Sequence, residues 1–316
     1  MQQKILDRIT KICGVPGLSE ILGSRLSGAD LNSLLLEVFR QKTAHMQASD
    51  LLQAYRSNRF VQPATVDAID FQAFALEALR LSRGSGFRPL LLSPVSPLGA
   101  CSVVATAHQD KILSALRGTE VVADATNVLA LESVLRRAEQ QFPPETLHFS
   151  TTHRHVRAQE IPDIPGYSAH FTILGLTSAG RDTGSFMFEK ETLLQHIGLY
   201  IKYLKETLQL PWVQIRLIAL NQEATPNRLF EAVEAHIRQS APEWSVSRIA
   251  SKASEQSYYQ HLQFKIVIPG PGGQEIDIAD GGYTDWTQRL SGNRKERFLI
   301  SGLGLELLFK SVRREA

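Results

Sequence analysis

Cysteine is scarce in this chain of 316 residues, which contains only Cys13 and Cys101. Two cysteines cannot form a disulfide framework or a four-cysteine zinc site. We expect both to be buried thiols, because free cysteine behaves as a small hydrophobic residue. A chain of this length can bury a substantial apolar core without such cross-links, and a reducing cytoplasm is the simplest compartment for it.

Excess charge is also missing, because the 34 basic and 32 acidic residues leave a net charge of +2. Contacts to phosphates dominate affinity for nucleic acids, so a nearly neutral chain is not expected to bind tRNA. The 43% of hydrophobic and 21% of charged residues are typical of a soluble globular protein.

Long apolar runs are absent as well, since no stretch approaches the roughly 18 apolar residues of a membrane span. The first residues, MQQKILDRITKICGV, alternate charged and apolar side chains. They lack the continuous apolar segment of a signal peptide. We therefore expect a cytoplasmic protein that has no membrane partner.

Residues 1–62 are predicted to form a small helical domain. Ser27 and Asp30 are both able to cap a helix, because their side-chain oxygens can accept a hydrogen bond from a free backbone N–H. Apolar residues then recur at helical spacing, namely Leu31, Leu34, Leu35, Val38 and Phe39. Ser49 is a candidate cap for a second helix. Packing or docking is the simplest role for this segment, which carries no basic run.

Residues 63–316 mix helices and strands, which indicates an α+β domain. A helix is expected where apolar residues form one face, namely Phe71, Phe74, Ala75, Ala78 and Leu79. The helix should end near Gly84, and Phe87 to Leu92 is then predicted to be a buried strand. Further along, a polar turn precedes a helix that begins near Asp124, which can cap it.

Two antiparallel strands are predicted between residues 145 and 179, joined by a loop rich in proline and glycine. The side chains of His153, His155 and Arg157 share one face of the first strand, because a strand alternates with a period of two. A metal site needs three or four ligands, and no third partner for the two histidines is evident. We therefore predict no metal site here.

A hairpin is predicted between Tyr258 and Tyr283. Its first strand places apolar residues on one face, namely Leu262, Phe264, Ile266 and Ile268. After a PGPGG turn, the return strand reaches Gly281 and Gly282, which allow close approach of another backbone. Packing of the hairpin is one explanation for the adjacent tyrosines Tyr258 and Tyr259.

The sharpest signal is FLISGLGLELLFK, from Phe298 to Lys310, in which a strand with Gly302 and Gly304 runs into a helix opened by Glu306. Glycine weakens a strand unless a ligand or another backbone must approach closely. The run therefore predicts a close approach at this strand.

Taken in order, these segments resemble class II aminoacyl-tRNA synthetases. The helix and strand that start near residue 68 resemble motif 1, the strand pair resembles motif 2, and the final strand and helix resemble motif 3. The hairpin with its tyrosine pair and Gly-Gly turn most closely resembles histidyl-tRNA synthetase and the regulatory subunit of ATP phosphoribosyltransferase. The resemblance covers about residues 68–316.

The resemblance implies an antiparallel sheet flanked by helices, with the small helical domain of residues 1–62 in front of it. It also implies that about residues 206–255 are an insertion between motifs 2 and 3. We expect no anticodon-binding domain, although the family has one, because the sequence continues only to Ala316 after motif 3. Motif 1 forms the dimer interface in that family, so a homodimer is implied. A regulatory paralogue would also have an enzyme partner.

The resemblance further implies two sets of site residues. The ATP-binding set is Arg157, Gln159, Phe171, Gly302, Gly304 and Glu306, with Mg²⁺ as the accompanying ion. The amino-acid pocket is Asp124, Thr126, Tyr258, Tyr259, Gly281 and Gly282. Arg157 is the implied catalytic residue, because it falls where the family arginine holds the α-phosphate, and Phe171 falls where a phenylalanine stacks on adenine. A surface cation and an ordinary core residue are the simpler interpretations of these two.

Five positions depart from the family pattern, among them Ala123 in place of a proline and Leu131 in place of an arginine. Leu307 and Ser254 stand where the family has arginines, and Gln159 stands in place of a glutamate. Losing one preorganised electrostatic contact typically costs about 100- to 1000-fold in rate. Our leading hypothesis is a paralogue that binds an amino acid or similar small ligand, acts as a regulatory or accessory protein, and does not aminoacylate tRNA. The alternative is an ATP-dependent ligase that adenylates a carboxylate for an acceptor other than tRNA.

Overall fold

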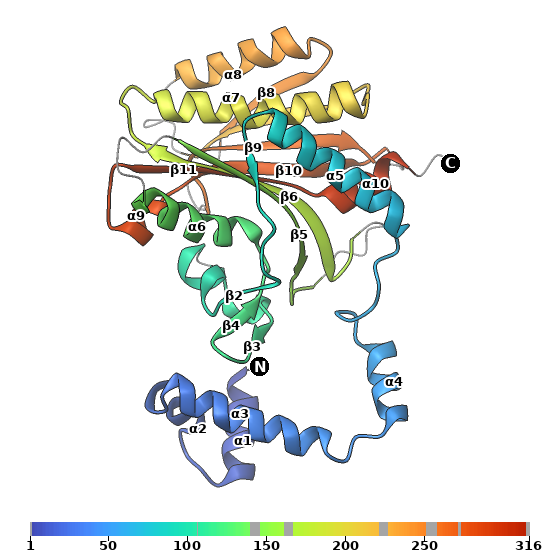
Figure 1. Cartoon of the computed structure of the whole chain (residues 1–316), viewed down its shortest axis with the longest axis vertical. Helices are drawn as coiled ribbons and strands as arrows, with labels where there is room; N and C mark the ends of the chain where they lie inside the picture. Colours follow the sequence, from blue (N-terminus) through green and yellow to red (C-terminus); the bar gives the residue numbers. More distant parts are fainter. Residues whose placement is uncertain are drawn as a thin grey trace.

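An eight-stranded sheet forms the centre of the computed structural model (Figure 1), which describes residues 2–105, 107–139, 146–160, 167–220, 227–250, 258–270 and 273–313. In spatial order its strands are β1 (Arg88–Pro89), β5 (Leu147–Val156), β6 (His170–Arg181), β11 (Glu296–Leu303), β10 (Glu275–Thr284), β9 (Gln260–Pro269), β7 (Gln214–Ala219) and β8 (Ser245–Ala250). The neighbours from β5 to β7 are antiparallel, and β1 and β8 add a parallel strand at each edge. The predicted α+β fold with an antiparallel sheet is therefore confirmed.

Helices cover both faces of the sheet (Figure 1). The larger core lies on one face, under α5 (Ala68–Gly84), α7 (Met187–Ile201) with its π-helical continuation η4 (Lys202–Thr207), and α8 (Asn227–Ser240). The helices α6 (Ala125–Glu139) and α9 (Trp286–Ser291) pack in a smaller apolar cluster on the other face. Helix α10 (Leu305–Val312) follows β11 and packs on α5 through Phe309 and Phe71, whose ring centroids lie 5.4 Å apart.

Local sequence signals explain where α5 begins and ends. The Asp67 carboxylate accepts a hydrogen bond from Asp70 N at 2.9 Å and so caps the start of the helix. Its predicted apolar residues Phe71 and Phe74 are buried, and Gly86 turns the chain with a φ of 88°. The following strand is much shorter than predicted. Only β1 forms, followed by one hydrogen bond from Leu90 N to Ser150 O at 2.8 Å, and Leu91 beyond it is 97% exposed.

A small three-stranded sheet, β2 (Val95–Pro97), β4 (Thr119–Val121) and β3 (Ser114–Ala115), lies beside α6. The π-helical turn η2 (Ala100–Val104) and the 3-10 turn η3 (Gln109–Lys111) lie between β2 and β3 in the sequence. Buried Glu120 in β4 accepts hydrogen bonds from Gly99 N and Cys101 N, so its charge is held by backbone donors.

The predicted hairpin is present as β9 and β10, and Leu262, Phe264 and Ile266 are fully buried. Its register shifts between Asp277 and Ala279, which marks a β-bulge. The segment predicted as an insertion supplies β7, α8 and β8, which extend this same sheet beyond β9.

The first helices lie apart from the sheet (Figure 1). They are α1 (Gln2–Cys13), α2 (Leu18–Glu20), the π-helical turn η1 (Ile21–Arg25), α3 (Gly28–Thr43) and α4 (Ala48–Ser57). Ser27 caps α3, as predicted, by accepting from Asp30 N at 3.1 Å. Ser49 does not cap α4, because that helix starts earlier, with Gln47 before it. The prediction that both cysteines are buried was wrong for Cys13, which is exposed.

The helical segment and the rest of the chain share little packing. No side chain among residues 3–57 is buried. Polar contacts join Arg117 N to Asn32 Oδ1 at 2.8 Å, Arg59 Nη2 to Gln159 O at 2.7 Å, and His170 Nε2 to Gln62 O at 2.6 Å. The division at residue 62 into two domains stays a prediction. No helix among the described residues is both long and apolar enough to cross a membrane.

Candidate functional site

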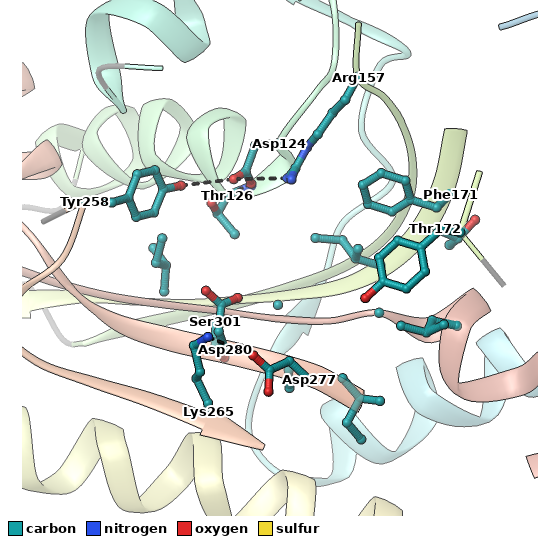
Figure 2. Close-up of a pocket in the computed structure, with 18 of the residues that line it drawn as sticks. Asp124, Thr126, Arg157, Phe171, Thr172, Tyr258, Lys265, Asp277, Asp280 and Ser301 are labelled. Carbon is teal, nitrogen blue, oxygen red and sulfur yellow. Dashed lines mark hydrogen bonds and ion pairs between the residues drawn. The ribbon is translucent and has the colours of Figure 1, made fainter. Parts of the chain in front are cut away.

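A cavity of about 410 Å³ opens on the face of the sheet that carries α6. Figure 2 shows Asp124, Thr126 and Tyr258 on one side of it and Lys265, Asp277 and Asp280 on the other. A second cavity of about 750 Å³ adjoins it and extends toward Cys101. The two share a set of lining residues, namely Asp124, Arg157, Gln159, Tyr258, Tyr259, Lys265 and Asp280.

Most of the predicted site residues are brought together in this cavity. Those that line it are Asp124, Thr126, Arg157, Gln159, Phe171, Tyr258, Tyr259, Gly302 and Gly304. They come from segments far apart in the sequence. They meet in one cavity because β5, β6, β10 and β11 are neighbours or near neighbours in the sheet. Glu306, Gly281 and Gly282 do not line it.

Asp124 precedes α6 and has the capping role that its position suggested. One carboxylate oxygen accepts hydrogen bonds from Thr126 N at 2.9 Å and from Thr126 Oγ1 at 2.7 Å. The other accepts from the Tyr258 hydroxyl at 3.0 Å. Burial acts to raise the pKa of Asp124, but Arg157 and the bonds from Thr126 outweigh it and hold the pKa below its usual value. Asp124 therefore caps the helix and also presents a carboxylate to the cavity.

Arg157 follows the end of β5 and lies beside Phe171 of β6, with its guanidinium carbon 5.3 Å from the ring centroid. Its Nε donates to Ala123 O at 2.9 Å, and its Nη2 lies 3.9 Å from Asp124 Oδ2. Arg157 is thus not a free surface cation. The interpretation of Phe171 as ordinary core is wrong, since its ring lines the cavity.

The adjacent tyrosines hold two different carboxylates. Tyr258 donates to Asp124, and Tyr259 donates from its hydroxyl to Asp280 Oδ2 at 3.0 Å. Their rings meet edge to face, with centroids 4.9 Å apart. Burial, followed by the nearby carboxylates, raises the pKa of both tyrosines well above the usual value, so both remain hydrogen-bond donors at neutral pH.

Sequence reasoning missed Lys265, Asp277 and Asp280. Lys265 Nζ lies 2.7 Å from Asp277 Oδ2. Asp277 and Asp280 are three positions apart on β10, a spacing that would place them on opposite faces of a regular strand. The bulge between Asp277 and Ala279 brings both to the cavity. The pairing of Lys265 with Asp280 across the hairpin was the signal that could have pointed to this group.

The strand β11 forms the floor of the cavity with Gly302 and Gly304, and Leu307 of α10 adds an apolar side chain. A Cβ at Gly302 would find its nearest neighbour, Ile173 Cδ1, at 3.4 Å. Glu306 turns away from the cavity and is almost fully buried. Its Oε2 lies 3.0 Å from Arg154 Nη2 and its Oε1 lies 2.9 Å from Lys310 Nζ, so two cations balance its charge.

Gly281 and Gly282 are explained by packing within the sheet. A Cβ at Gly281 would lie 2.5 Å from Ser301 Cβ, and one at Gly282 would lie 2.7 Å from Leu262 O and from the Tyr259 ring. These distances are too short for any larger residue. The glycines thus let Tyr259 pack closely on the sheet, instead of contacting the cavity themselves.

His153 and His155 of β5 lie side by side, with ring centroids 5.7 Å apart. His155 Nε2 accepts a hydrogen bond from Ala125 N at 3.0 Å, which ties β5 to the start of α6, and burial lowers the pKa of His155 to about 3. Within the described residues, no three His, Cys, Asp or Glu side chains gather as a metal site. Ser254, residues 161–166 and residues 271–272, which the sequence predictions included, lie outside the described residues.

Solved structures of class II synthetase type resemble this chain. An ATP phosphoribosyltransferase regulatory subunit/histidyl-tRNA synthetase from Bacillus halodurans matches with a TM-score of 0.61 and 13% identity, over 81% of this chain and 83% of that chain. Histidyl-tRNA synthetase from S. aureus matches with a TM-score of 0.58 and 13% identity, over 82% and 70%. A histidine–tRNA ligase subunit from Alicyclobacillus acidocaldarius matches with a TM-score of 0.56 and 12% identity, over 81% and 96%.

No protein-family model and no curated protein sequence matches the chain. The structural likeness nevertheless establishes its fold, which is that of the class II aminoacyl-tRNA synthetases, in the form seen in histidyl-tRNA synthetase and the ATP phosphoribosyltransferase regulatory subunit. At this level of identity the likeness carries the fold alone.

The cavity fits the implied ATP and Mg²⁺ poorly. A nucleotide triphosphate brings several negative charges, whereas the cavity presents Asp124, Asp277 and Asp280. Its cations, Arg157 and Lys265, are outnumbered by these three carboxylates, so the lining has no excess positive charge for a triphosphate. The carboxylate of Glu306, predicted in the ATP site, is turned inward. We therefore derive no chemical step through ATP or Mg²⁺.

Proposed function

We propose that this chain binds an amino acid or a similar small ligand in the cavity between α6 and β10, and that it serves as a regulatory or accessory protein without aminoacylating tRNA. The observation that supports this most is the position of Leu307. It lines the cavity next to Gly302 and Gly304, where the resemblance places an arginine for the nucleotide. An apolar side chain there cannot stabilise charge on a phosphate.

The contacts around Asp124 suit an amino acid. An ammonium group placed at the Asp124 carboxylate would form charge-assisted hydrogen bonds, and Tyr258 and Thr126 already fix the position of that carboxylate. The guanidinium of Arg157, 3.9 Å from Asp124, would hold the carboxylate of the ligand. The opposite charges of an amino acid thereby match a pair of opposite charges in the cavity.

Isothermal titration calorimetry with the twenty amino acids and with ATP tests this proposal. We expect at least one amino acid to bind the wild-type protein, and Asp124→Asn to weaken it by about tenfold or more, because a charge-assisted hydrogen bond is lost. Asp110→Asn changes an exposed carboxylate outside both cavities and serves as the control. Rapid exchange of pyrophosphate into ATP with any amino acid would overturn the proposal.

A second candidate is the ATP-dependent ligase, which is favoured by Arg157, Phe171 and Gly302 lining one cavity. The charge of that cavity weighs against it. This candidate predicts that ATP binds at millimolar concentration and that Arg157→Ala abolishes ATP turnover. Calorimetry with ATP separates the two candidates, because only the ligase requires the nucleotide.

As part of this proposal, the chain forms a homodimer and has an enzyme as its partner. Exposed apolar side chains support the homodimer, because Ile69 is 81% and Leu76 46% exposed on α5, and Leu91 beyond β1 is almost fully exposed. These residues lie in the segment that resembles motif 1. Light scattering should give twice the chain mass for the wild type, and Leu91→Asp should shift the mass toward the monomer. A wild-type monomer at micromolar concentration would contradict the homodimer.

A further inference from the structure

Asp280 is a second carboxylate that faces the cavity from the side opposite Asp124 (Figure 2). The consecutive residues Tyr258 and Tyr259 each donate one hydroxyl, the first to Asp124 and the second to Asp280, both at 3.0 Å. Because the tyrosine rings are in contact, the two carboxylates are held in a fixed relation by one aromatic pair. This arrangement joins three separate parts of the chain, namely the turn before α6, the start of β9 and the strand β10.

The charge of Asp280 is not balanced by an ion pair with any described residue. Lys265 is its partner in the register of the hairpin, but Lys265 Nζ lies 2.7 Å from Asp277 instead. Arg157 lies near Asp124 and donates from Nε to Ala123 O. The Asp280 side chain is open to the cavity, so a ligand can reach it.

The environment of Asp280 disfavours an unpaired negative charge. Burial comes first among the causes that raise its pKa, and the charge of Asp124 adds to it, while Tyr259, Arg157 and Lys265 act in the opposite direction. A positive charge placed between Asp124 and Asp280 would offset both the burial of the Asp280 charge and its repulsion by Asp124.

We propose that Asp280 binds a positively charged side chain of the ligand, so that the ligand is an amino acid with a cationic side chain. This inference rests on the proposed function and deepens it. Asp124 holds the α-ammonium group, and Asp280 holds the second positive charge across the cavity. A bound metal ion does not explain Asp280 as well, because the described residues offer no group of three ligands there.

Three probes separate this inference from the proposed function. L-Lysine carries the second ammonium group, L-norleucine has a side chain of similar shape without it, and 1,5-diaminopentane keeps both ammonium groups but lacks the carboxylate. L-Arginine and L-histidine extend the set, and histidine is measured at pH 6 so that its ring is partly charged. Calorimetry is carried out with the full-length wild type, Asp280→Asn and the control Asp110→Asn.

We expect at least one cationic amino acid to bind about tenfold or more tightly than norleucine, since a hydrogen bond between charged groups is lost with norleucine. Asp280→Asn should remove this preference and leave norleucine binding unchanged, while Asp110→Asn should keep the preference. If norleucine binds as tightly as every cationic probe, the inference about Asp280 is wrong and the proposed function stands.

The remaining outcomes are also decisive. If diaminopentane binds through Asp280 and no amino acid binds, the two-carboxylate cation site stands, and the proposed recognition of an amino acid fails. If no probe binds, the inference about Asp280 is overturned, and the titration with all twenty amino acids then decides the proposed function. Asp280→Asn is expected to fold, because it removes a charge that its surroundings disfavour, and circular dichroism of the variant verifies this before binding is measured.

Discussion

The guanidinium carbon of Arg157 lies 5.3 Å from the centroid of the Phe171 ring, so the two residues that resemble a phosphate ligand and an adenine platform contact each other. A base that stacked on this side of Phe171 would have to displace the guanidinium. The same guanidinium is anchored to Ala123 O and lies near Asp124. Arg157 therefore connects the motif 2 strands to the turn before α6, and its charge is directed to the part of the cavity where we place an amino acid.

Arg157→Ala should weaken binding of the amino-acid ligand by about 10- to 100-fold, because it removes a charged hydrogen-bond partner of the ligand carboxylate. Arg157→Lys keeps the charge but loses the planar donor geometry, so it should give an intermediate loss. Calorimetry with both variants checks this. Equal affinity of the wild type and the alanine variant would rule out the role given to Arg157.

Asp280→Asn should raise the free energy of unfolding at pH 7. The pKa of Asp280 is raised in the folded protein, so above that pKa its ionised form is disfavoured by folding. This gain in the free energy of unfolding should shrink as the pH falls through the raised pKa of Asp280. It should vanish below about 3.9, the pKa of aspartate in the unfolded chain. Urea unfolding of the variant and the wild type at several pH values measures this difference. A variant that is less stable at pH 7 would contradict it.

Acid should destabilise the protein below pH 6.5 through the buried His155 and His196 and the half-buried His148. Burial lowers the pKa of His148 to about 4, that of His155 to about 3 and that of His196 well below its usual value. The unfolded chain takes up these protons near pH 6.5, so each histidine costs about 1.4 kcal/mol per pH unit until its folded pKa is reached. Urea unfolding between pH 7 and pH 5 measures the slope.

His196 offers a direct check of this pH effect. Its ring accepts or donates hydrogen bonds with Ser178 Oγ at 2.9 Å and Ser301 Oγ at 2.8 Å. His196→Leu should reduce the slope, although it lowers stability at pH 7 by about 1–3 kcal/mol because two buried hydroxyls lose a partner. His108→Gln, at an exposed histidine, should leave the slope unchanged. An unchanged slope in His196→Leu would show that this ring does not contribute.

Gly281→Ala should destabilise the fold by about 1–3 kcal/mol, since the added Cβ would lie 2.5 Å from Ser301 Cβ and 2.7 Å from Ile300 O. Gly302→Ala is the matched control, because its Cβ would meet no atom closer than 3.4 Å. The stability of this variant should stay within about 1 kcal/mol of the wild type. Gly302→Ala should instead reduce ligand affinity, as it narrows the cavity. Thermal unfolding and calorimetry separate these effects.

Removal of residues 1–57 should leave the remaining chain folded. None of the side chains from residue 3 to residue 57 is buried, and the contact between Asn32 and Arg117 is exposed. The midpoint of thermal unfolding should change by less than about 4 °C, the shift expected for about 1 kcal/mol. Amino-acid binding should be retained. A truncated chain that fails to fold would disprove the division into two domains near residue 62.

Patterns within short segments of the sequence predicted the elements and their order. The cap at Ser27, the apolar face of α5 and the alternation along β9 were all correct, because they depend on neighbouring residues and a fixed period. Gly302 and Gly304 line the cavity, and the close approach of a ligand that they indicate stays a prediction. Most of the site residues that the resemblance implied line the cavity, since the motifs preserve the spacing of a shared fold.

The tertiary structure alone decided which side chains face the cavity. The bulge after Asp277 turns Asp280 toward Asp124, a change of one residue in register that alternation cannot reveal. Glu306 faces inward because Arg154 of β5 and Lys310 of α10 are both in reach, and Gly281 faces Ser301 of the next strand. These contacts join residues distant in sequence. Local preferences fix the strands, but only their pairing and packing determine where each charge lies.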